Sequence, residues 1–478
     1  MNRPGPHWIP LGLSYIAAAL RRGGHAVSIF DRFAAAGLLG PNKEKINAYM
    51  LEQLRSFKPD LVGLNTVTPL IYDTAECAAL VRDSFNGLLL AGGHHATALP
   101  ELTLKNIPQL DGVVQGEGEN ALLRLAEGEN PAHIQGVWWK NNGRVNGSAP
   151  EQIPDLDCLP FPAFDLLEMP FYIRRGRNAI KGHHLSTAAL ITSRGCTRRC
   201  DFCSEALTYG QGVRRHSPGY VLEMIGRVVT EYPVEAIYFH DNDFLSDGER
   251  AAAICERLID TDLHRRVKFS IQTRVSRLNP DILGLLKRAG CTLVEMGIET
   301  ASQAELDSVH KGTTVELNER AVEMCRRAGL AVHAYMLTGF AGETGAELEE
   351  RRQWLKQRPG NFSFSMSMLQ LYPGTRLYRE RGASFFEHNR WTGETVGAFY
   401  QRDHLSAVPA AERKVWMERK FLPLQKWRNR TALLRRNPPL VIARIILDKA
   451  ARLWRSPGRE NMPRAAGLQS GRDRKIIQ

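Results

Sequence analysis

Two series of short apolar segments, each alternating with helical patterns, constrain the fold of this chain more than any other feature. The first series predicts buried strands at Leu61–Asn65, Leu88–Ala91 and Gly112–Gln115. Strands that alternate with helices of this length are typical of parallel sheets with helices on both faces. The second series predicts six more strands, at Ala188–Thr192, Glu235–Phe239, Lys268–Gln272, Leu293–Ile298, Val332–Leu337 and Phe362–Leu369.

The first series occupies residues 1–150 and predicts a doubly wound, Rossmann-like α/β domain. His25–Phe30 adds a further expected strand, and helices are expected at Leu11–Arg22, Lys43–Phe57 and Thr74–Phe85. Such domains normally open with a strand, whereas this chain begins at Met1 almost on its first helix. We therefore expect either that the first strand is missing or that Met1 lies downstream of the true start, and we favour the second explanation.

The rest of the chain divides into three parts. Residues 151–185 are rich in proline and predict a linker. Six strand–helix units over residues 186–375 are too few for an eight-unit barrel but fit an open, partial (β/α)6 barrel. Residues 376–478 predict a helical, aromatic and basic extension. The expected fold class is therefore α/β, with two parallel-sheet domains followed by helices.

Composition limits the compartment. The chain has 478 residues, of which 43% are hydrophobic and 24% charged, as in ordinary globular proteins. Three of its eight cysteines lie within eight positions, which favours a reducing cytoplasm and one metal site over a disulfide framework. The apolar run Trp8–Leu20 is short and carries its charges on the wrong side for a signal peptide, so it predicts a buried helix.

Cys196, Cys200 and Cys203 lie directly after the first strand of the second series. Thiolates ligate iron–sulfur clusters, and three of them leave the fourth iron of a cubane open to another ligand. Zinc is the alternative, but structural zinc normally takes four ligands, and the sequence contains no second Cys-x2-Cys pair to complete them. The triad therefore predicts a 4Fe–4S cluster.

The spacing Cys-x3-Cys-x2-Cys, with the aromatic Phe202 before the last cysteine, resembles the signature of the radical S-adenosylmethionine (SAM) superfamily. The resemblance implies that the open iron chelates SAM and that an external donor of the flavodoxin or ferredoxin type supplies one electron. Reduction then yields methionine and a 5′-deoxyadenosyl radical. The positions that the resemblance assigns to SAM binding follow expected strand ends, and are Asp241, Asn242, Asp243, Gln272, Arg274, Glu299, Gly339 and Gly342.

The first domain resembles the cobalamin-binding domain found in one large branch of these enzymes. The resemblance is carried by Pro10–Leu20, Gly92-Gly93-His94-His95 and Gly116-Glu117-Gly118-Glu119. Asp31-Arg32-Phe33 lacks the histidine that many cobalamin proteins use as lower cobalt ligand, so cobalt without that ligand is expected. His95 is the nearest substitute, although a hydrogen bond near the corrin or a plain loop position stays open. The expected cofactor contacts are Thr66, Thr68, Gly92, Gly93, His95, Gly116 and Glu117.

The net charge of +12 belongs to the tail, because residues 402–478 carry 19 Lys+Arg and 6 Asp+Glu. A helix packed on its own domain with a solvated basic face is the favoured interpretation of this segment. A cap over the barrel mouth, or peripheral contact with the inner membrane face, is also open. No nucleic-acid module is recognisable, so nucleic acid is not expected as a partner. The aromatic and aliphatic positions of the pattern are Trp416, Phe421, Leu424, Trp427, Leu440, Ile442, Ile445, Ile446, Leu453 and Trp454.

Together these resemblances imply a cobalamin-dependent radical SAM enzyme that methylates an unactivated carbon of a small, lipid-like or natural-product substrate. A radical cyclase or rearrangement enzyme with the same cofactors is the enzyme alternative, and a cobalamin-binding sensor is the non-enzyme alternative. Methylthiolation is disfavoured because no second cysteine triad occurs in the first domain. Tyr335, Met336, Met366 and Met368 suggest an apolar pocket, although such residues are more often core. No further catalytic residue follows from the sequence.

Overall fold

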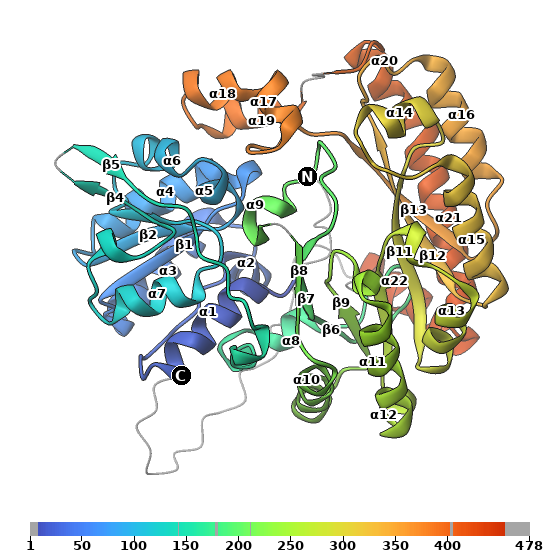
Figure 1. Ribbon diagram of the computed structural model, residues 1–478, viewed down its shortest axis with the longest axis horizontal. Helices are drawn as coiled ribbons and strands as arrows, with labels where there is room; N and C mark the ends of the chain where they lie inside the picture. The colour runs from blue at the N-terminus through green and yellow to red at the C-terminus, as the bar shows by residue number, and fades with distance from the viewer. Residues whose placement is uncertain (1–7, 142, 177–179, 211, 402–404, 455–478) are drawn as a thin grey trace.

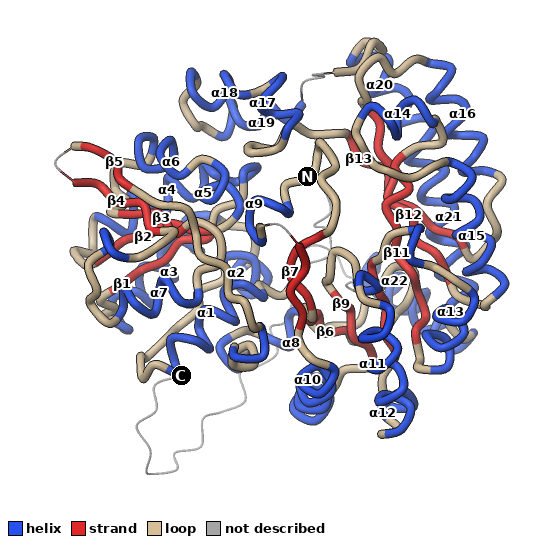
Figure 2. The backbone as a smooth tube through the Cα atoms, in the orientation of Figure 1, coloured by secondary structure: helices blue, strands red, loops and turns tan. Residues whose placement is uncertain are grey.

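The computed structural model describes residues 8–141, 143–176, 180–210, 212–401 and 405–454. Two separate sheets organise these residues, a five-stranded sheet from the first part of the chain and a six-stranded sheet from the second. The two sheets lie on opposite sides of the molecule, with the short hairpin β7–β8 between them (Figures 1 and 2).

The first sheet has the strand order β1-β2-β3-β4-β5. The three predicted strands are confirmed and run parallel, whereas β4 and β5 form an antiparallel hairpin that was not predicted. The Asn-Asn-Gly sequence at 141–143 is the turn signal that could have revealed this hairpin. The strands are β1 (Leu61–Asn65), β2 (Leu88–Gly92), β3 (Gly112–Val114), β4 (Val137–Asn141) and β5 (Arg144–Asn146), and the main helices are α1 (Leu11–Arg22), α2 (Arg32–Leu39), α3 (Lys43–Phe57), α4 (Ile71–Arg82), α5 (His94–Ala98), α6 (Pro100–Asn106) and α7 (Glu119–Ala126).

The prediction of a strand at His25–Phe30 is wrong. No residue of this segment belongs to a helix or strand. Val27 and Ile29 instead pack against the small side chains Ala17, Ala18 and Ala163. Alternation of apolar residues allows one face of a segment to be buried, but a β-strand also needs a neighbouring strand to which its backbone can hydrogen-bond. This segment pairs with no strand in the described chain.

The second sheet has the order β13-β12-β11-β10-β9-β6 and is parallel throughout. All six predicted strands are confirmed, and helices cover the outer face as in a partial barrel (Figure 1). Met336 and Met366 belong to the core beneath these helices. The strands are β6 (Thr187–Leu190), β9 (Ala236–Phe239), β10 (Lys268–Gln272), β11 (Cys291–Glu299), β12 (Ala331–Thr338) and β13 (Phe362–Met368), and the main outer helices are α10 (Pro218–Glu231), α11 (Gly248–Asp260), α13 (Pro280–Arg288), α15 (Val315–Arg327) and α16 (Gly345–Lys356).

The cysteine segment departs from the expected simple loop. Ser193–Cys196 forms strand β7, which pairs antiparallel with β8 (Gly212–Arg215), so Cys196 is the last residue of a strand. Gly195 has φ +98°, and a Cβ at this position would lie 2.2 Å from the Gly212 carbonyl oxygen. Glycine is therefore required where the two backbones approach directly before the first cysteine.

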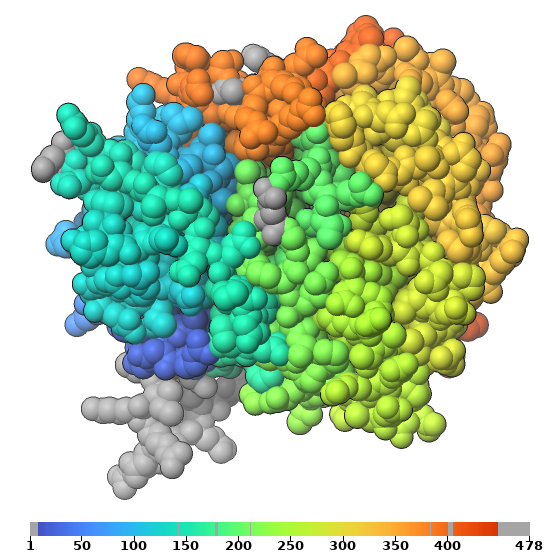
Figure 3. Space-filling view, in the orientation of Figure 1, coloured from blue at the N-terminus to red at the C-terminus, as the bar shows by residue number. Residues whose placement is uncertain are grey.

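The C-terminal extension divides between the two sheets. Helices α17 (Arg376–Arg381), α18 (Ala383–His388) and α19 (Gly393–Gln401) pack through Phe386, Trp391 and Phe399 into the core of the first domain. These helices cross above the space between the two halves of the molecule, orange in Figure 3.

Helix α21 (Leu422–Arg436) packs instead along β13, the edge strand of the barrel. Asn429 Oδ1 accepts from the Phe364 amide at 3.3 Å, and Gln425 Oε1 accepts from the Met366 amide at 2.9 Å. The helix thus supplies acceptors that an edge strand would otherwise lack, which agrees with a tail packed on its own domain. It follows α20 (Ala410–Val415) and a π-helical turn at Trp416–Phe421, and α22 (Pro439–Trp454) comes after it.

A search for helices with the length and apolarity of a membrane span finds none in the described chain.

Arg436 fastens the end of α21 to the barrel, because its guanidinium donates to the carbonyl oxygens of Lys181 (2.7 Å), Val332 (3.1 Å) and Asn361 (2.5 Å). Arg436→Met removes a charged donor from each of three carbonyl oxygens, and we expect the free energy of unfolding in urea to fall by about 2–3 kcal/mol. The neighbouring Arg435→Met is the control, since Arg435 is exposed. Equal stability of the two variants would contradict this account.

Candidate active site

The three cysteines gather at the end of β7 and in the turn that follows it. The Cys203 amide donates to the Cys200 carbonyl at 3.0 Å, and α9 (Glu205–Tyr209) begins directly afterwards. Partial loss of water around the sulfur raises the pKa of Cys200, and it raises the pKa of Cys203 to about 12 although Cys203 as a whole residue is exposed, with smaller contributions from the neighbouring thiolates. Iron must therefore displace thiol protons when it binds. The remaining cysteines lie elsewhere, so this donor set fits a cluster held by three thiolates.

No group of three or more His, Cys, Asp or Glu side chains in the described residues is arranged to hold a single metal ion.

A buried cation stands beside the triad. Burial lowers the pKa of Lys311, but the carboxylate of Glu299 and the Cys200 thiolate outweigh this effect, so the pKa is raised. Lys311 pairs with Glu299, whose φ is +66°, and its Nζ lies 5.8 Å from the centre of the Phe202 ring. A fixed positive charge at this place favours thiolate over thiol. Sequence analysis missed Lys311 because its partner is twelve residues away, on β11.

Two of the residues predicted to bind SAM, Asp241 and Asp243, accept hydrogen bonds from neighbouring segments of the chain. Asp241 is fully buried and accepts from the amide (3.1 Å) and the hydroxyl (3.0 Å) of Thr192, and from the hydroxyl of Ser193. Asp243 is also buried and accepts from the Thr273 hydroxyl at 2.9 Å. These carboxylates fix the segments that lead into the cysteine hairpin and out of β10.

The other strand-end positions surround the triad. Asn242 Nδ2 donates to Glu205 of α9 at 3.1 Å. Arg274 is half-buried, and burial lowers its pKa, against the opposing effect of the Cys196 and Cys200 thiolates beside it. Gln272 donates to the Tyr238 hydroxyl and so lies further into the barrel. Arg274 and Asn242 are thus the predicted residues that reach the cluster segment.

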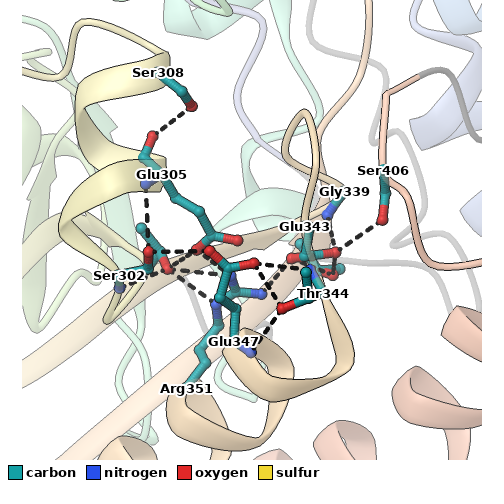
Figure 4. A network of polar contacts seen from close by, with 11 residues as sticks. Ser302, Glu305, Ser308, Gly339, Glu343, Thr344, Glu347, Arg351 and Ser406 are labelled. Carbon is teal, nitrogen blue, oxygen red and sulfur yellow. Dashed lines mark hydrogen bonds and ion pairs between the residues drawn. The ribbon is translucent and has the colours of Figure 1, made fainter.

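The turn after β12 contains the predicted glycines Gly339 and Gly342, both with positive φ, and Figure 4 shows the polar contacts around Gly339 and Glu343. Gly339 has φ +93°, and its amide donates to Glu343 at 2.9 Å. The fully buried Arg351 donates to Glu343 at 2.6 Å and also binds Glu305. Because removal of one partner would leave buried charge uncompensated, this network locks the turn at the carboxyl end of the strand. The role of Arg351 was not found from sequence, because its partner Glu305 lies 46 residues away on α14 (Gln303–Ser308).

The carboxyl ends of β1 and β2 meet at Thr66. Its hydroxyl donates to the Gly92 carbonyl at 2.7 Å and accepts from the Ala96 amide at 3.0 Å. Gly93 has φ +94°, and a Cβ there would lie 2.3 Å from Asn65 Oδ1. The Gly116 amide donates to the Thr97 hydroxyl at 3.0 Å. These strand ends therefore form a narrow, glycine-lined edge, which fits the close approach of a large cofactor.

His95 lies beside that edge, because its amide donates to the Thr66 carbonyl at 3.3 Å, but its side chain is buried. It has no exposed surface, its Nδ1 lies 3.1 Å from the Thr68 hydroxyl, and its ring packs edge-on against Phe386 (5.4 Å) and Trp391 (4.8 Å). Burial lowers the pKa of His95 to about 3, so the ring is neutral. Phe33, at the position of the lower-ligand histidine in the resemblance, is 55% exposed.

A network of mostly buried charges joins the first domain to the β7–β8 hairpin. Arg194 of β7 binds Glu117 and Glu119 of the first domain, each at 2.6 Å, and Arg214 of β8 binds Glu117 at 2.5 Å. The side chains of Arg194, Glu117 and Glu119 are 2–5% exposed. Glu117, predicted as a cofactor contact, is therefore placed as a link to the hairpin that carries Cys196. We call these four residues the interdomain clamp.

A second contact shows which edges face each other. His94, at the start of α5, lies with its Nδ1 2.8 Å from the hydroxyl of Thr208 on α9. The glycine-lined strand ends of the first domain therefore face the segment that follows Cys203. Thr66, Gly92, Gly93 and Gly116 are the residues that would hold cobalamin at this edge, and Arg274, Asn242 and Lys311 are those on the cluster side.

Polar side chains that were not predicted from the sequence, Glu295 and the hydroxyl of Tyr335, lie inside the barrel. Glu295 is fully buried, and one carboxylate oxygen accepts from the Tyr335 hydroxyl. Burial raises the pKa of Glu295 to about 7. Its other oxygen, Oε1, has no hydrogen-bond partner among the described residues. Tyr335, which suggested an apolar pocket, donates its hydroxyl to this carboxylate. Met336 and Met366 belong to the buried core, as methionines at strand spacing more often do.

Comparisons with known proteins agree with this arrangement. Residues 190–355 match the model of the radical SAM superfamily, and residues 1–126 match that of the B12 binding domain. An uncharacterized methyltransferase of Pyrococcus horikoshii is 31% identical over 375 residues, which are 77% of each chain. The anaerobic magnesium-protoporphyrin IX monomethyl ester cyclase of Rubrivivax gelatinosus is 28% identical over 87% of this chain and 75% of its own.

Among solved structures, the radical SAM methyltransferase TsrM from Kitasatospora setae, with cobalamin and a [4Fe-4S] cluster bound, has a TM-score of 0.65 at 18% identity. The match covers 80% of this chain and 74% of that one, and it is a likeness of fold.

Glu117→Gln tests the interdomain clamp, because it removes the charge that two buried guanidinium groups share. We expect the free energy of unfolding in urea to fall by about 3–5 kcal/mol, as for other buried pairs that lose one partner. The control is Glu223→Gln, which breaks an exposed pair with Arg227 and should cost less than about 1 kcal/mol. A loss at Glu117 no larger than that at Glu223 would show that the clamp does not hold the domains.

Proposed function

The chain belongs to the radical SAM family with an N-terminal B12-binding domain, and from this membership we propose that it transfers methyl groups to an unactivated carbon. Members of this family carry a 4Fe–4S cluster, SAM and cobalamin. When bound, the cluster supplies the electron that cleaves SAM, and cobalamin carries the methyl group. A carbon of low acidity resists ordinary acid–base chemistry, which is a reason to combine the two cofactors.

The residues of the chain position this chemistry. Cys196, Cys200 and Cys203 would hold three irons, and the buried Lys311 would balance negative charge beside them. Arg274 can pair bidentately with the carboxylate of SAM. Asp241 holds the hairpin through Thr192 and Ser193, so the cysteine turn cannot shift relative to β9.

One observation carries the proposal above the others. The strand ends of the first domain and the cysteine segment face each other, and the interdomain clamp ties them through Glu117 and Arg194. A cobalamin at the glycine-lined edge and SAM at the triad would therefore share one space. A sensor needs no such shared space and no cluster with an open iron. A cyclase could use the same arrangement, so methyl transfer needs its own test.

The substrate is proposed to be a small molecule of the natural-product or lipid-like class that also carries a hydrogen-bond donor. Glu295 supports this, because its Oε1 is buried inside the barrel without a partner. A buried acceptor left unpaired costs about 1–3 kcal/mol, which a substrate donor would recover. An electron carrier of the flavodoxin or ferredoxin type is proposed as the source of electrons.

The enzyme is proposed to act in the cytoplasm, with peripheral contact at the inner membrane face through α21 and α22. Trp427 (56% exposed), Leu434 (54%), Leu440 (85%) and Leu447 (68%) present apolar surface on these helices. Exposed basic residues are interspersed with them, namely Lys426, Arg430, Arg435 and Arg444. Apolar side chains among cations suit an anionic bilayer surface.

The membrane proposal predicts that the full chain sediments with phosphatidylglycerol vesicles and not with phosphatidylcholine vesicles. The double variant Trp427→Glu/Leu440→Glu should lose most of this binding, because it places charge in the apolar face. Leu38→Glu is the matched control, since Leu38 is 53% exposed on α2 of the other domain. Equal sedimentation of both variants would refute membrane contact by these helices.

The catalytic proposal predicts two products from methyl-labelled SAM. The reduced, reconstituted enzyme with cobalamin should form both S-adenosylhomocysteine and 5′-deoxyadenosine. Cys200→Ala should lose its iron–sulfur absorbance and its 5′-deoxyadenosine, whereas Cys158→Ala should keep both, because Cys158 lies outside the triad. 5′-Deoxyadenosine without any S-adenosylhomocysteine would favour cyclisation or rearrangement over methyl transfer.

A further inference from the structure

Around the cysteine turn, two carboxylates are buried and the basic side chains that pair with them are more exposed. Asp201 is 7% exposed and binds His310 at 2.7 Å and Arg376 at 3.7 Å, whereas these partners are 59% and 52% exposed. Asp243 is fully buried, and its partner Arg277, at 3.4 Å, is 36% exposed. Each carboxylate is thus hidden from solvent beneath a basic side chain. Arg376 also pairs with the exposed carboxylate of Glu380 at 2.8 Å, so its charge is balanced at the surface. Arg277 has no exposed carboxylate partner among the described residues, and a positive face therefore begins at Arg277.

Two further arginines extend this face within the cysteine segment itself. Arg198 and Arg199 lie between Cys196 and Cys200, and both are exposed. Neither forms an ion pair with a carboxylate of the described residues. The guanidinium of Arg198 lies over Gly312, since a Cβ added to Gly312 would be 3.1 Å from Arg198 Nη1. The pKa of Arg274 is lowered mainly by burial and additionally by the positive charge of Arg198. Like charges are thus held close together at this place.

This accumulation is not a consequence of the overall charge. Residues 1–401 have 44 Lys+Arg and 45 Asp+Glu, a net of −1, so the body of the protein is close to neutral. A local cationic face on a neutral body marks a place where an anionic partner is steered. Unpaired, exposed guanidinium groups are also the donors that bind carboxylates bidentately.

The face lies next to the group that must receive electrons. Cys203 is exposed, and the cysteine segment, green, reaches the molecular surface between the two halves, below α17–α19 (Figure 3). Close approach of a partner here would bring its redox centre near the cluster without opening the interdomain clamp.

We propose that Arg198, Arg199 and Arg277 form the docking face for an acidic one-electron carrier protein of the flavodoxin class. The proposal rests on the proposed function, because only a cluster that cleaves SAM needs repeated reduction. In the transfer itself the carrier loses one electron and the cluster gains it, and no bond is made or broken. The electron then enters the sulfonium of SAM and breaks its bond to C5′.

The experiment compares two reductants on the same holoenzyme in an anaerobic stopped-flow instrument, with cluster absorbance as the signal. Flavodoxin hydroquinone is the protein donor, and photoreduced deazaflavin is a small donor that needs no docking face. The test variant is Arg198→Glu/Arg199→Glu. The control is Arg265→Glu, which reverses an exposed charge on α12 (Leu263–Arg266), at the far side of the barrel.

We expect the charge reversal to slow reduction by flavodoxin about tenfold or more at low ionic strength, and the difference to shrink at high salt. Reduction by deazaflavin and the 5′-deoxyadenosine that follows it should be unchanged. An unchanged flavodoxin rate would overturn the proposal. So would an equal loss with both donors, since the arginines would then serve SAM or the cluster and not a carrier. Absence of SAM cleavage in the unmodified enzyme with deazaflavin would instead refute the proposed function.

Discussion

The buried ion pairs of Arg194 are the interaction on which the arrangement of the two domains depends. A guanidinium between Glu117 and Glu119 has left water, and this cost is offset only when both carboxylates are present in the correct geometry. Arg194 can contact both carboxylates only when the first domain and the β7–β8 hairpin are placed as they are in this structure. Because Cys196 is two residues beyond Arg194, the same placement sets where the cluster faces the strand ends of the first domain.

The charges around the cysteines follow a second constraint. Three thiolates and the carboxylate of SAM bring negative charge into a half-buried place, where it is stabilised only by nearby cations. Lys311 and Arg274 provide them inside the site. The nearby carboxylates add no negative charge to the surface, because they are buried and accept hydrogen bonds from neighbouring segments; they are Asp201, Asp241 and Asp243. The site is therefore electropositive by arrangement, although residues 1–401 carry almost no net charge.

Sequence patterns predicted the parts of this structure that local periodicity and spacing determine. The six barrel strands and the three parallel strands of the first sheet follow from apolar runs, and the cysteine triad follows from spacing alone. The patterns did not reveal contacts that depend on a partner far away in the sequence. Glu117 belongs to the clamp because Arg194 lies 77 residues away, and His95 is buried because Trp391 covers it. His25–Phe30 has the alternation of a strand but no neighbouring strand in the described chain.

The central claim is that the cluster and cobalamin share one space between the two sheets. Electron paramagnetic resonance of the holoenzyme, with cobalt as Co(II) and the cluster reduced, tests this claim directly. We predict that both signals are broadened or split by mutual magnetic coupling, and that each becomes simple when the other centre is diamagnetic. Two unperturbed signals from a protein that holds both centres in the same chain would contradict the account.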